Sequence, residues 1–353
     1  MNFKHISTAL VVLALSVAAF AQQPQGQNPP RPQQNGQQAP QRRMPQIDPT
    51  NPNAHDPVLA EENGTYYLFT TGTGILKSKD LRTWESDGNV FDGQFPQWPR
   101  EHGLGGGGYW APDVVYHNGE WHIFYAVSAF AKNTSVIGHA TNKTLDRSNP
   151  DYKWVDKGMI VESIPYRDMW NAIDPAVTVD ENGDPWMVFG SFWDGMKLVK
   201  LKKDMSAVAE PQVWRTVSRR YRTFSLDDND PGDGAVEAPF IFKKNGWYYL
   251  LVSFDYCCRG INSDYKIVVG RSRNVEGPYL DKDGVRMDMG GGTVIASATE
   301  DYVGIGHCGA YTLKNGEDVL VAHAYMTAQN GASKLMVMNL VWDNDGWFTL
   351  KKR

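Results

Sequence analysis

Three carboxylic acids occupy matched places in a repeated sequence motif. Asp56 and Asp174 each stand directly before a proline, and Glu237 stands one residue further back from its own proline. A lone Asp before a proline usually caps a turn. Three such acids brought to one place would raise each other's pKa and destabilise the fold. We therefore expect these acids to serve chemistry rather than structure.

The chemistry that suits such a set is hydrolysis of a glycosidic bond. That reaction needs one protonated carboxyl group, which gives a proton to the leaving oxygen, and one ionised carboxylate, which activates a water. Glu237 has the longer side chain and a different register, so we expect it to be the general acid. One Asp would then be the base and the other would tune the pair by its charge. The residues alone leave open which Asp does which.

The motif that carries these acids recurs five times along the chain. The first four copies read His-Asp-Pro-Val at 55–58, Trp-Ala-Pro-Asp at 110–113, Ile-Asp-Pro-Ala at 173–176 and Glu-Ala-Pro-Phe at 237–240. Asn-Gly follows each proline after six or seven residues, and the same spacing identifies a fifth copy at 307–310, with Gly309 in the place of proline. Asn-Gly between apolar runs is a strong hairpin signal. Each copy therefore predicts a hairpin.

Further strands are expected after each hairpin. Third strands are predicted at 74–78, 135–139, 196–200, 265–269 and 334–338, and outer strands near 89–91, 154–155, 213–214 and 293–295. Units of about four antiparallel strands, without an amphipathic helix, are typical of propeller blades. We predict an all-β fold, a five-bladed β-propeller with four antiparallel strands per blade, over residues 47–353.

A propeller would gather the motif around its axis, because the first strand of each blade lines the central channel. The residues directly before the proline position are Asp56, Ala111, Asp174, Ala238 and Cys308. The residues one position earlier are His55, Trp110, Ile173, Glu237 and His307. This alignment predicts that the three acids meet in one pocket.

Composition and charge limit the partners. The net charge of -5 argues against nucleic acid, which attracts a basic surface. Aromatic residues are abundant, with 12 Trp, 16 Tyr and 14 Phe, and they suit stacking on sugars, although most should lie in the core. The three cysteines form neither a disulfide framework nor a zinc motif. Adjacent Cys257 and Cys258 could close a disulfide ring or remain reduced and buried.

The N-terminal region has the features of an exported protein. Residues 1–21 combine Lys4, an apolar run and the ending Ala19-Phe20-Ala21, which predicts a secretory signal peptide cleaved near Ala21. Residues 22–46 are rich in Gln and Pro and are predicted to be a disordered spacer. No later stretch is long enough to span a bilayer. We expect a secreted or periplasmic monomer.

Taken in order, the motifs resemble those of glycoside hydrolase family 43, and most closely those of its arabinanases. The resemblance runs from about Asn53 to about Trp347 and rests on the four motif copies at 55–57, 110–113, 171–175 and 237–239 and on the segments 190–193 and 253–260. It implies an inverting endo-acting hydrolase of α-1,5-linked L-arabinan, a side chain of plant cell-wall pectin. Inversion would place the two catalytic carboxyl groups roughly 6.5–9.5 Å apart.

The resemblance also implies roles for particular residues. Asp56 matches the general base, Asp174 the acid that modulates the pKa and orients the pair, and Glu237 the general acid. His323 matches a ligand of an axial metal, usually read as calcium. The positions that match substrate contacts, by stacking or by hydrogen bonds to hydroxyl groups, are His55, Trp110, Asn171, Ser191, Phe192 and His307.

Other readings remain open at this stage. The same family contains exo-acting arabinanases, α-L-arabinofuranosidases and β-xylosidases. Retaining fructan hydrolases also use propellers, but their Asn-Asp-Pro-Asn-Gly start and Glu-Cys acid are not found in this sequence. A propeller that binds glycans without turnover is the alternative from another class. Arabinan or arabino-oligosaccharide is the expected partner in the first reading.

Overall fold

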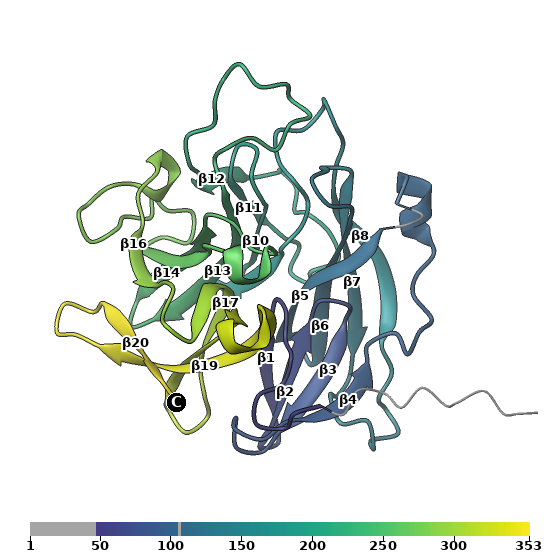
Figure 1. Ribbon diagram of the computed structural model, residues 1–353. Helices are drawn as coiled ribbons and strands as arrows, with labels where there is room; N and C mark the ends of the chain where they lie inside the picture. The colour runs from purple at the N-terminus through teal and green to yellow at the C-terminus, as the bar shows by residue number, and fades with distance from the viewer. Residues whose placement is uncertain (1–46, 105–106) are drawn as a thin grey trace, which may run out of the picture. The chain divides into compact units, whose positions relative to one another are not determined.

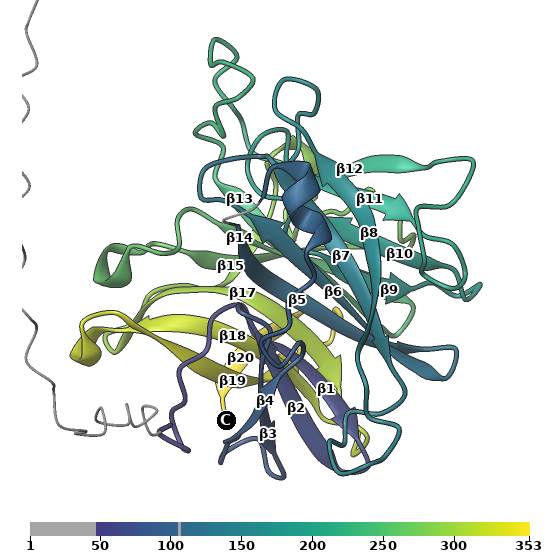
Figure 2. The same cartoon turned by 90° about the vertical axis from the view of Figure 1, so that its right-hand side faces the viewer.

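The computed structural model describes residues 47–104 and 107–353, which form five four-stranded antiparallel sheets. The signal peptide and the spacer predicted for residues 1–46 lie outside the described residues. Within each sheet the strands pair in chain order, and the five sheets follow one another around a ring (Figure 1). The predicted five-bladed β-propeller with four strands per blade is confirmed. In the view turned by 90°, strands β13 to β15 lie beside β17 to β19 (Figure 2).

The blades have the following bounds. Blade 1 comprises β1 (Val58–Glu62), β2 (Thr65–Thr70), β3 (Gly74–Ser78) and β4 (Glu85–Asn89). Blade 2 comprises β5 (Gly108–His117), β6 (Glu120–Ser128), β7 (Ser135–Asn142) and β8 (Val155–Ser163). Blade 3 comprises β9 (Ala176–Val179), β10 (Pro185–Phe189), β11 (Met196–Lys200) and β12 (Trp214–Ser218). Blade 4 comprises β13 (Val236–Lys244), β14 (Trp247–Phe254), β15 (Lys266–Ser272) and β16 (Thr293–Ala296). Blade 5 comprises β17 (Tyr302–Thr312), β18 (Asp318–Met326), β19 (Ala332–Trp342) and β20 (Phe348–Lys352).

Short 3-10 turns are the only helical elements in the described part of the chain, at Trp98–His102, Gly260–Asn262, Met287–Met289 and Thr327–Gln329. No described helix has the length and apolar character needed to cross a membrane.

The central strands are buried along most of their length because neighbouring blades cover both of their faces. In β6, the residues from Trp121 to Ser128 are all buried, and Ile123 and Phe124 have no exposed surface. Burying one such side chain contributes about 1.5–3 kcal/mol. The outer strands β4, β8 and β12 are partly exposed, and the packed inner strands hold the inner ends of the blades in fixed positions.

The strand predictions were accurate for the third strands and less so for the edges. The outer strand predicted near 89–91 is β4 at Glu85–Asn89. Val90 and Phe91 belong to the apolar cluster between blades 1 and 2 and do not pair with β3. Their apolar character reports burial, which sequence cannot distinguish from strand pairing. The fifth outer strand, β20, had no prediction.

A left-handed backbone residue marks the motif in every blade. These residues are Asp56, Ala111, Asp174, Ala238 and His307, with φ of 51°, 22°, 55°, 54° and 46°. The strand pairing is interrupted at the same place, between Trp110 and Asp113, between Glu237 and Phe240, and between Gly306 and Gly309. Such a bulge bends the strand and re-aims a side chain.

This geometry corrects the alignment of the fifth copy. His307 has the left-handed conformation that Asp56 and Asp174 have, so His307 and not Cys308 is their equivalent. Cys308 takes the place of proline and is buried in the core. The alignment was wrong by one residue because the fifth copy has no proline to mark its register. The bulge therefore directs two carboxylates and one imidazole, rather than carboxylates alone, toward the axis.

Candidate active site

A cavity of about 360 Å³ opens where the first strands of the blades begin. All three predicted catalytic acids line it, and so do all six predicted contact residues. Side chains from all five blades contribute, from Asp56 in the first to His307 in the fifth. His323 does not line the cavity, because it lies fully buried behind Asp56.

Asp56 is a carboxylate held by partners from several blades. Thr71 Oγ1 donates a hydrogen bond to Asp56 Oδ2 at 2.5 Å, and His307 Nδ1 lies 3.0 Å from Oδ1. Burial alone would raise the pKa of Asp56, but the charge of His307 and His55 and the hydrogen bond from His307 bring it well below its ordinary value. Asp56 is therefore ionised at neutral pH.

His307 carries the matching positive charge. Burial lowers the pKa of His307, but the Asp56 carboxylate outweighs burial and raises it to about 9. The imidazolium therefore neutralises one carboxylate in a cavity that holds three carboxyl groups. A charged pair with a short hydrogen bond is stable here because each partner satisfies the other.

Glu237 has the opposite electrostatic environment. Burial raises the pKa of Glu237 above its ordinary value, and hydrogen bonds from Ser191 and Tyr265 only partly oppose this effect. Ser191 Oγ donates to Oε2 at 2.6 Å and Tyr265 Oη donates to Oε1 at 2.7 Å. The carboxyl group is thus fixed by both of its oxygens while burial favours its protonated form.

Asp174 resembles Glu237 rather than Asp56 in its electrostatic environment, and its pKa is raised to about 8. Burial raises its pKa, and the negative charges of Glu237 and Asp56 add to the rise while His307 opposes it. Its Oδ2 accepts a hydrogen bond from the amide of Ala238 at 3.1 Å, directly after Glu237. Asp174 therefore connects blade 3 to the backbone that positions Glu237.

Thr71 and Tyr265 were missed by sequence reasoning. Thr71 follows the end of β2, and its hydroxyl also accepts the amide of Ala111 at 2.9 Å, which links blades 1 and 2 at the acid. Tyr265 precedes β15 and is buried. Both stand at strand ends on the face where the motifs gather, which was a usable signal. Asp113 is a further buried acid near the axis, bonded through Oδ2 to the Val177 amide at 2.7 Å.

Replacing Tyr265 with phenylalanine tests how Glu237 is tuned. The tyrosine hydroxyl stabilises the ionised carboxylate, so its loss should raise the pKa of Glu237 and move the alkaline limb of kcat/KM upward by roughly one pH unit. The pH profiles of wild type, Tyr265→Phe and Tyr249→Phe would be compared. Tyr249 bonds the Gly346 carbonyl, remote from the cavity, so its variant is the control. An unmoved limb in Tyr265→Phe would contradict the assigned role.

The predicted contact residues differ in whether they face the cavity freely or already hydrogen-bond to other side chains. Trp110 and Phe192 are partly exposed in the cavity and can stack on a sugar ring. Ser191 is engaged by Glu237, and Asn171 Oδ1 accepts a hydrogen bond from Ser135 at 2.6 Å, so both also hold the wall in place. Phe130 was not predicted, although it lines the cavity and is 76% exposed.

The histidines around Asp56 form a group that can hold a metal ion. One donor atom each from His55, Asp56 and His323 lies within 4.8 Å of the others. His323 Nε2 is buried and has no hydrogen-bonding partner among the described side chains, whereas Nδ1 accepts the Asp56 amide at 3.1 Å. Two imidazoles and one carboxylate suit a nitrogen-preferring ion, and calcium takes six to eight oxygens. These residues do not fit calcium by themselves, so we derive no step through it.

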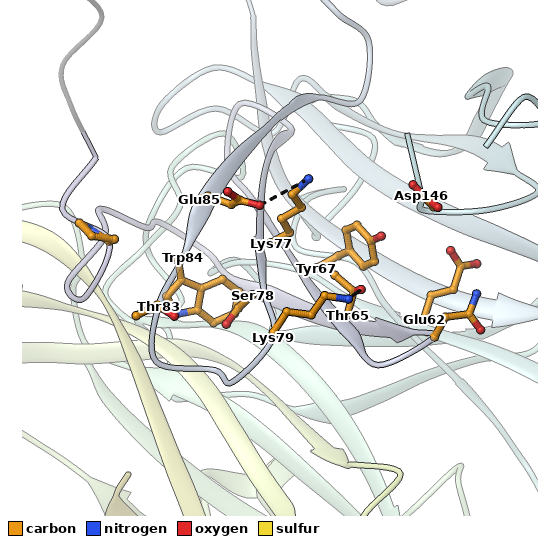
Figure 3. A pocket seen from close by; sticks show the side chains of 12 residues that line it. Glu62, Thr65, Tyr67, Lys77, Ser78, Lys79, Thr83, Trp84, Glu85 and Asp146 are labelled. Carbon is orange, nitrogen blue, oxygen red and sulfur yellow. Dashed lines mark hydrogen bonds and ion pairs between the residues drawn. The ribbon is translucent and has the colours of Figure 1, made fainter. Parts of the chain in front are cut away.

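A second hollow, of about 600 Å³, lies at the other end of blade 1, around the turn between β1 and β2 (Figure 3). Its charged groups already have structural partners. Lys77 lies 3.5 Å from Glu85, and Glu62 accepts hydrogen bonds from Trp121 at 2.8 Å and from the Leu145 amide at 2.9 Å. Glu62 therefore joins blades 1 and 2, and acid–base chemistry belongs to the axial cavity.

The state of the adjacent cysteines, which sequence left open, is a disulfide. Cys257 and Cys258 are joined to each other, and both line the axial cavity. Cys308 is a free thiol in the core, and burial raises its pKa. Since a buried protonated thiol is inert, Cys308 has a packing role.

Comparisons with known proteins identify similar chains over nearly the whole described region. Residues 49–348 match the sequence profile described as glycosyl hydrolases family 43. An extracellular exo-α-(1→5)-L-arabinofuranosidase of Cellvibrio japonicus is 48% identical over 296 residues, covering 83% of this chain and 85% of that protein. An extracellular endo-α-(1→5)-L-arabinanase of Bacillus subtilis is 38% identical over 299 residues, covering 83% and 86%. The structure of the Cellvibrio cellulosa α-L-arabinanase complexed with arabinohexaose superposes with a TM-score of 0.83 at 46% identity, covering 85% of this chain and 96% of that one.

Proposed function

The chain belongs to family 43 of the glycosyl hydrolases, and we propose that it hydrolyses α-1,5-linked L-arabinan in a single displacement that inverts the anomeric centre. One observation carries this proposal. Two carboxyl groups of one cavity have pKa values displaced in opposite directions, downward for Asp56 and upward for Glu237. A base and an acid are thus both ready at neutral pH. The relatives named as arabinan hydrolases, and the complex with arabinohexaose, support the substrate class.

In the proposed mechanism Asp56 activates the attacking water. The ionised carboxylate accepts a proton from the water as the water oxygen bonds to the anomeric carbon. Thr71 and His307 keep the carboxylate oriented, and the charge on His307 keeps it ionised until the proton arrives. This step requires a fixed carboxylate, because a water held by a mobile one would seldom be aligned.

Glu237 protonates the leaving oxygen on the other side of the same bond. The glycosidic carbon–oxygen bond breaks as Glu237 gives its proton to that oxygen, so no alkoxide is released. Ser191 and Tyr265 hold the carboxyl group and stabilise the carboxylate that forms. Asp174 accepts the Ala238 amide and so holds the backbone next to Glu237 in place during the proton transfer. Solvent then returns Asp56 and Glu237 to their starting states.

The position of the cut along the polymer has two candidates. The sequence resemblance favours endo action, and the 48% identity to an exo-acting relative favours the release of short products from a chain end. The product sizes formed early from linear arabinan decide between them. A ladder of oligomers means endo action, and one product size from the outset means exo action. No cleavage of any pentose polymer would favour a glycan-binding propeller and would contradict the proposed activity.

We also propose that the enzyme acts outside the cytoplasm. The relatives named as extracellular support the export predicted from residues 1–21. Calcium bound at His323 is predicted by the family resemblance alone. The side chains around His323 do not form a calcium site by themselves.

A further inference from the structure

The disulfide between Cys257 and Cys258 forms part of the wall of the axial cavity. It lies in the loop between β14 and β15, which runs over the face where the acids gather. Cys258 is exposed, and Cys257 is partly exposed. A structural disulfide usually joins distant segments and constrains the unfolded chain. A ring that closes on its own neighbour closes almost no loop, so stabilisation of the fold does not explain it.

The sulfur atoms lie close to the groups around the proposed base. Cys258 Sγ is 3.7 Å from His55 Nε2, and that nitrogen is 3.7 Å from Asp56 Oδ1. The hydroxyl of Tyr325 also lies 3.7 Å from Cys258 Sγ and accepts the Cys258 amide at 2.8 Å. The ring is thus separated from the carboxylate by one imidazole.

The loop that presents the ring is held tightly on both sides. The Tyr256 amide donates to Asp264 Oδ1 at 2.9 Å, and the Arg259 amide donates to Ser263 Oγ at 3.0 Å. The loop ends at Tyr265, which donates to Glu237. The ring therefore has a fixed position relative to both the base and the acid, as a substrate-positioning surface requires.

The chemical character of the ring suits a sugar. A disulfide has no hydrogen-bond donor and presents polarisable sulfur, which packs well against apolar C–H groups. Tyr256 extends this surface, since its ring lies 5.8 Å from that of Phe192 across the cavity wall. Two free thiols at the same place would be bulkier together, because non-bonded sulfurs must separate, and each would carry a polar S–H.

We propose that the Cys257–Cys258 disulfide is a sugar-contacting surface of the cleft that positions the substrate against Asp56 and makes substrate affinity sensitive to the redox state. The inference rests on the proposed arabinan hydrolysis. Reduction by a small dithiol breaks the S–S bond, adds two electrons and two protons to the protein and leaves two thiols, while the dithiol is oxidised to its own cyclic disulfide. Exposure of Cys258 gives the dithiol access.

Steady-state kinetics on linear arabinan before and after treatment with dithiothreitol test the proposal. In the wild type, reduction should raise KM roughly tenfold, the effect of losing a small apolar contact, with kcat changed less than twofold. The double variant Cys257→Ala/Cys258→Ala should have the raised KM already and should not respond to dithiothreitol. The variant Cys308→Ala should respond as the wild type does. Intact mass would verify the gain of two hydrogens.

Binding measurements separate this inference from the proposed function. The Glu237→Gln variant, which should bind without turnover, would be titrated with an arabino-oligosaccharide by calorimetry in the oxidised and reduced states. A roughly tenfold weaker Kd after reduction is expected. An unchanged Kd and KM in a protein that mass shows to be reduced would overturn the inference alone. A drop in kcat together with melting temperature, at constant KM, would show a structural ring and also overturn it. An oxidised protein that neither binds nor cleaves arabinan would overturn the proposed function and this inference together.

Discussion

Glu237→Gln is expected to lower kcat on linear arabinan by about 10²–10⁴-fold, the usual contribution of a general acid. Glutamine keeps the shape and can still bond to Ser191 and Tyr265, so the cavity should survive. What it cannot do is protonate the leaving oxygen. Stopped assays of reducing-end release on purified wild type and variant measure the loss.

The leaving group provides a second, sharper readout for Glu237. An aryl α-L-arabinofuranoside with an acidic phenol needs little protonation, so if the enzyme accepts it, Glu237→Gln should retain far more of its activity there than on arabinan. The alkaline limb of the wild-type pH profile should also disappear. Burial raises the pKa of Glu237, so its proton is present below that pKa and is lost as pH rises through it. Glu317→Gln, at an exposed hairpin tip, is the control and should stay within twofold. Equal losses on both substrates would contradict the role of acid.

Asp56→Asn is expected to lower kcat to a similar degree, by about 10²–10⁴-fold, but on arabinan and on the aryl glycoside alike. The attacking water needs its base whatever the leaving group is. Burial opposes ionisation of Asp56, but His307 and His55 bring its pKa well below the ordinary value, so activity is present above that pKa and is lost as pH falls through it. This acid limb should be missing from the residual activity of the variant.

The pKa of His307 tests whether Asp56→Asn acts through the loss of a negative charge. Asp56 raises the pKa of His307 to about 9, so removing the carboxylate should lower it, and this change can be followed by NMR titration of the imidazole. Asp184→Asn serves as the control, since Asp184 lies in the turn between β9 and β10, bonds Lys200 and does not line the cavity. A variant with full activity on the aryl glycoside would exclude Asp56 as the base. A fall in melting temperature that matches the loss of activity would indicate unfolding instead.

Local patterns were sufficient for the architecture. Asn-Gly turns, alternating apolar runs and a motif that recurs at regular intervals each concern residues close in sequence, and together they predict five hairpins and then five blades. The outer strands at the edges of the blades were predicted less accurately. Val90 and Phe91 are apolar because blade 2 covers them, and no local signal separates that burial from strand pairing.

The site was predicted in composition but not in its connections. Proline marks the register in the copies that carry the three acids, and that mark was readable: Asp56 and Asp174 stand directly before it and Glu237 stands one residue further back. In the fifth copy the mark is missing, so His307 was assigned to the wrong position. Thr71 follows β2 and Tyr265 precedes β15, and no motif marks either residue. Their strand ends come close to the acids only once the blades have packed together, so both residues were missed.

By itself, therefore, the sequence determined the number of blades and that the three acids lie at the starts of the first strands, because repeats and turns are encoded locally. Only the tertiary structure decided what each acid touches. The pairing of Asp56 with His307 joins the first blade to the last. The bond of Ser191 to Glu237 joins blade 3 to blade 4, and the bond of Tyr265 to Glu237 joins the start of β15 to β13. The opposite pKa shifts that separate base from acid arise from burial and from these contacts, so they exist only when the ring of blades has closed.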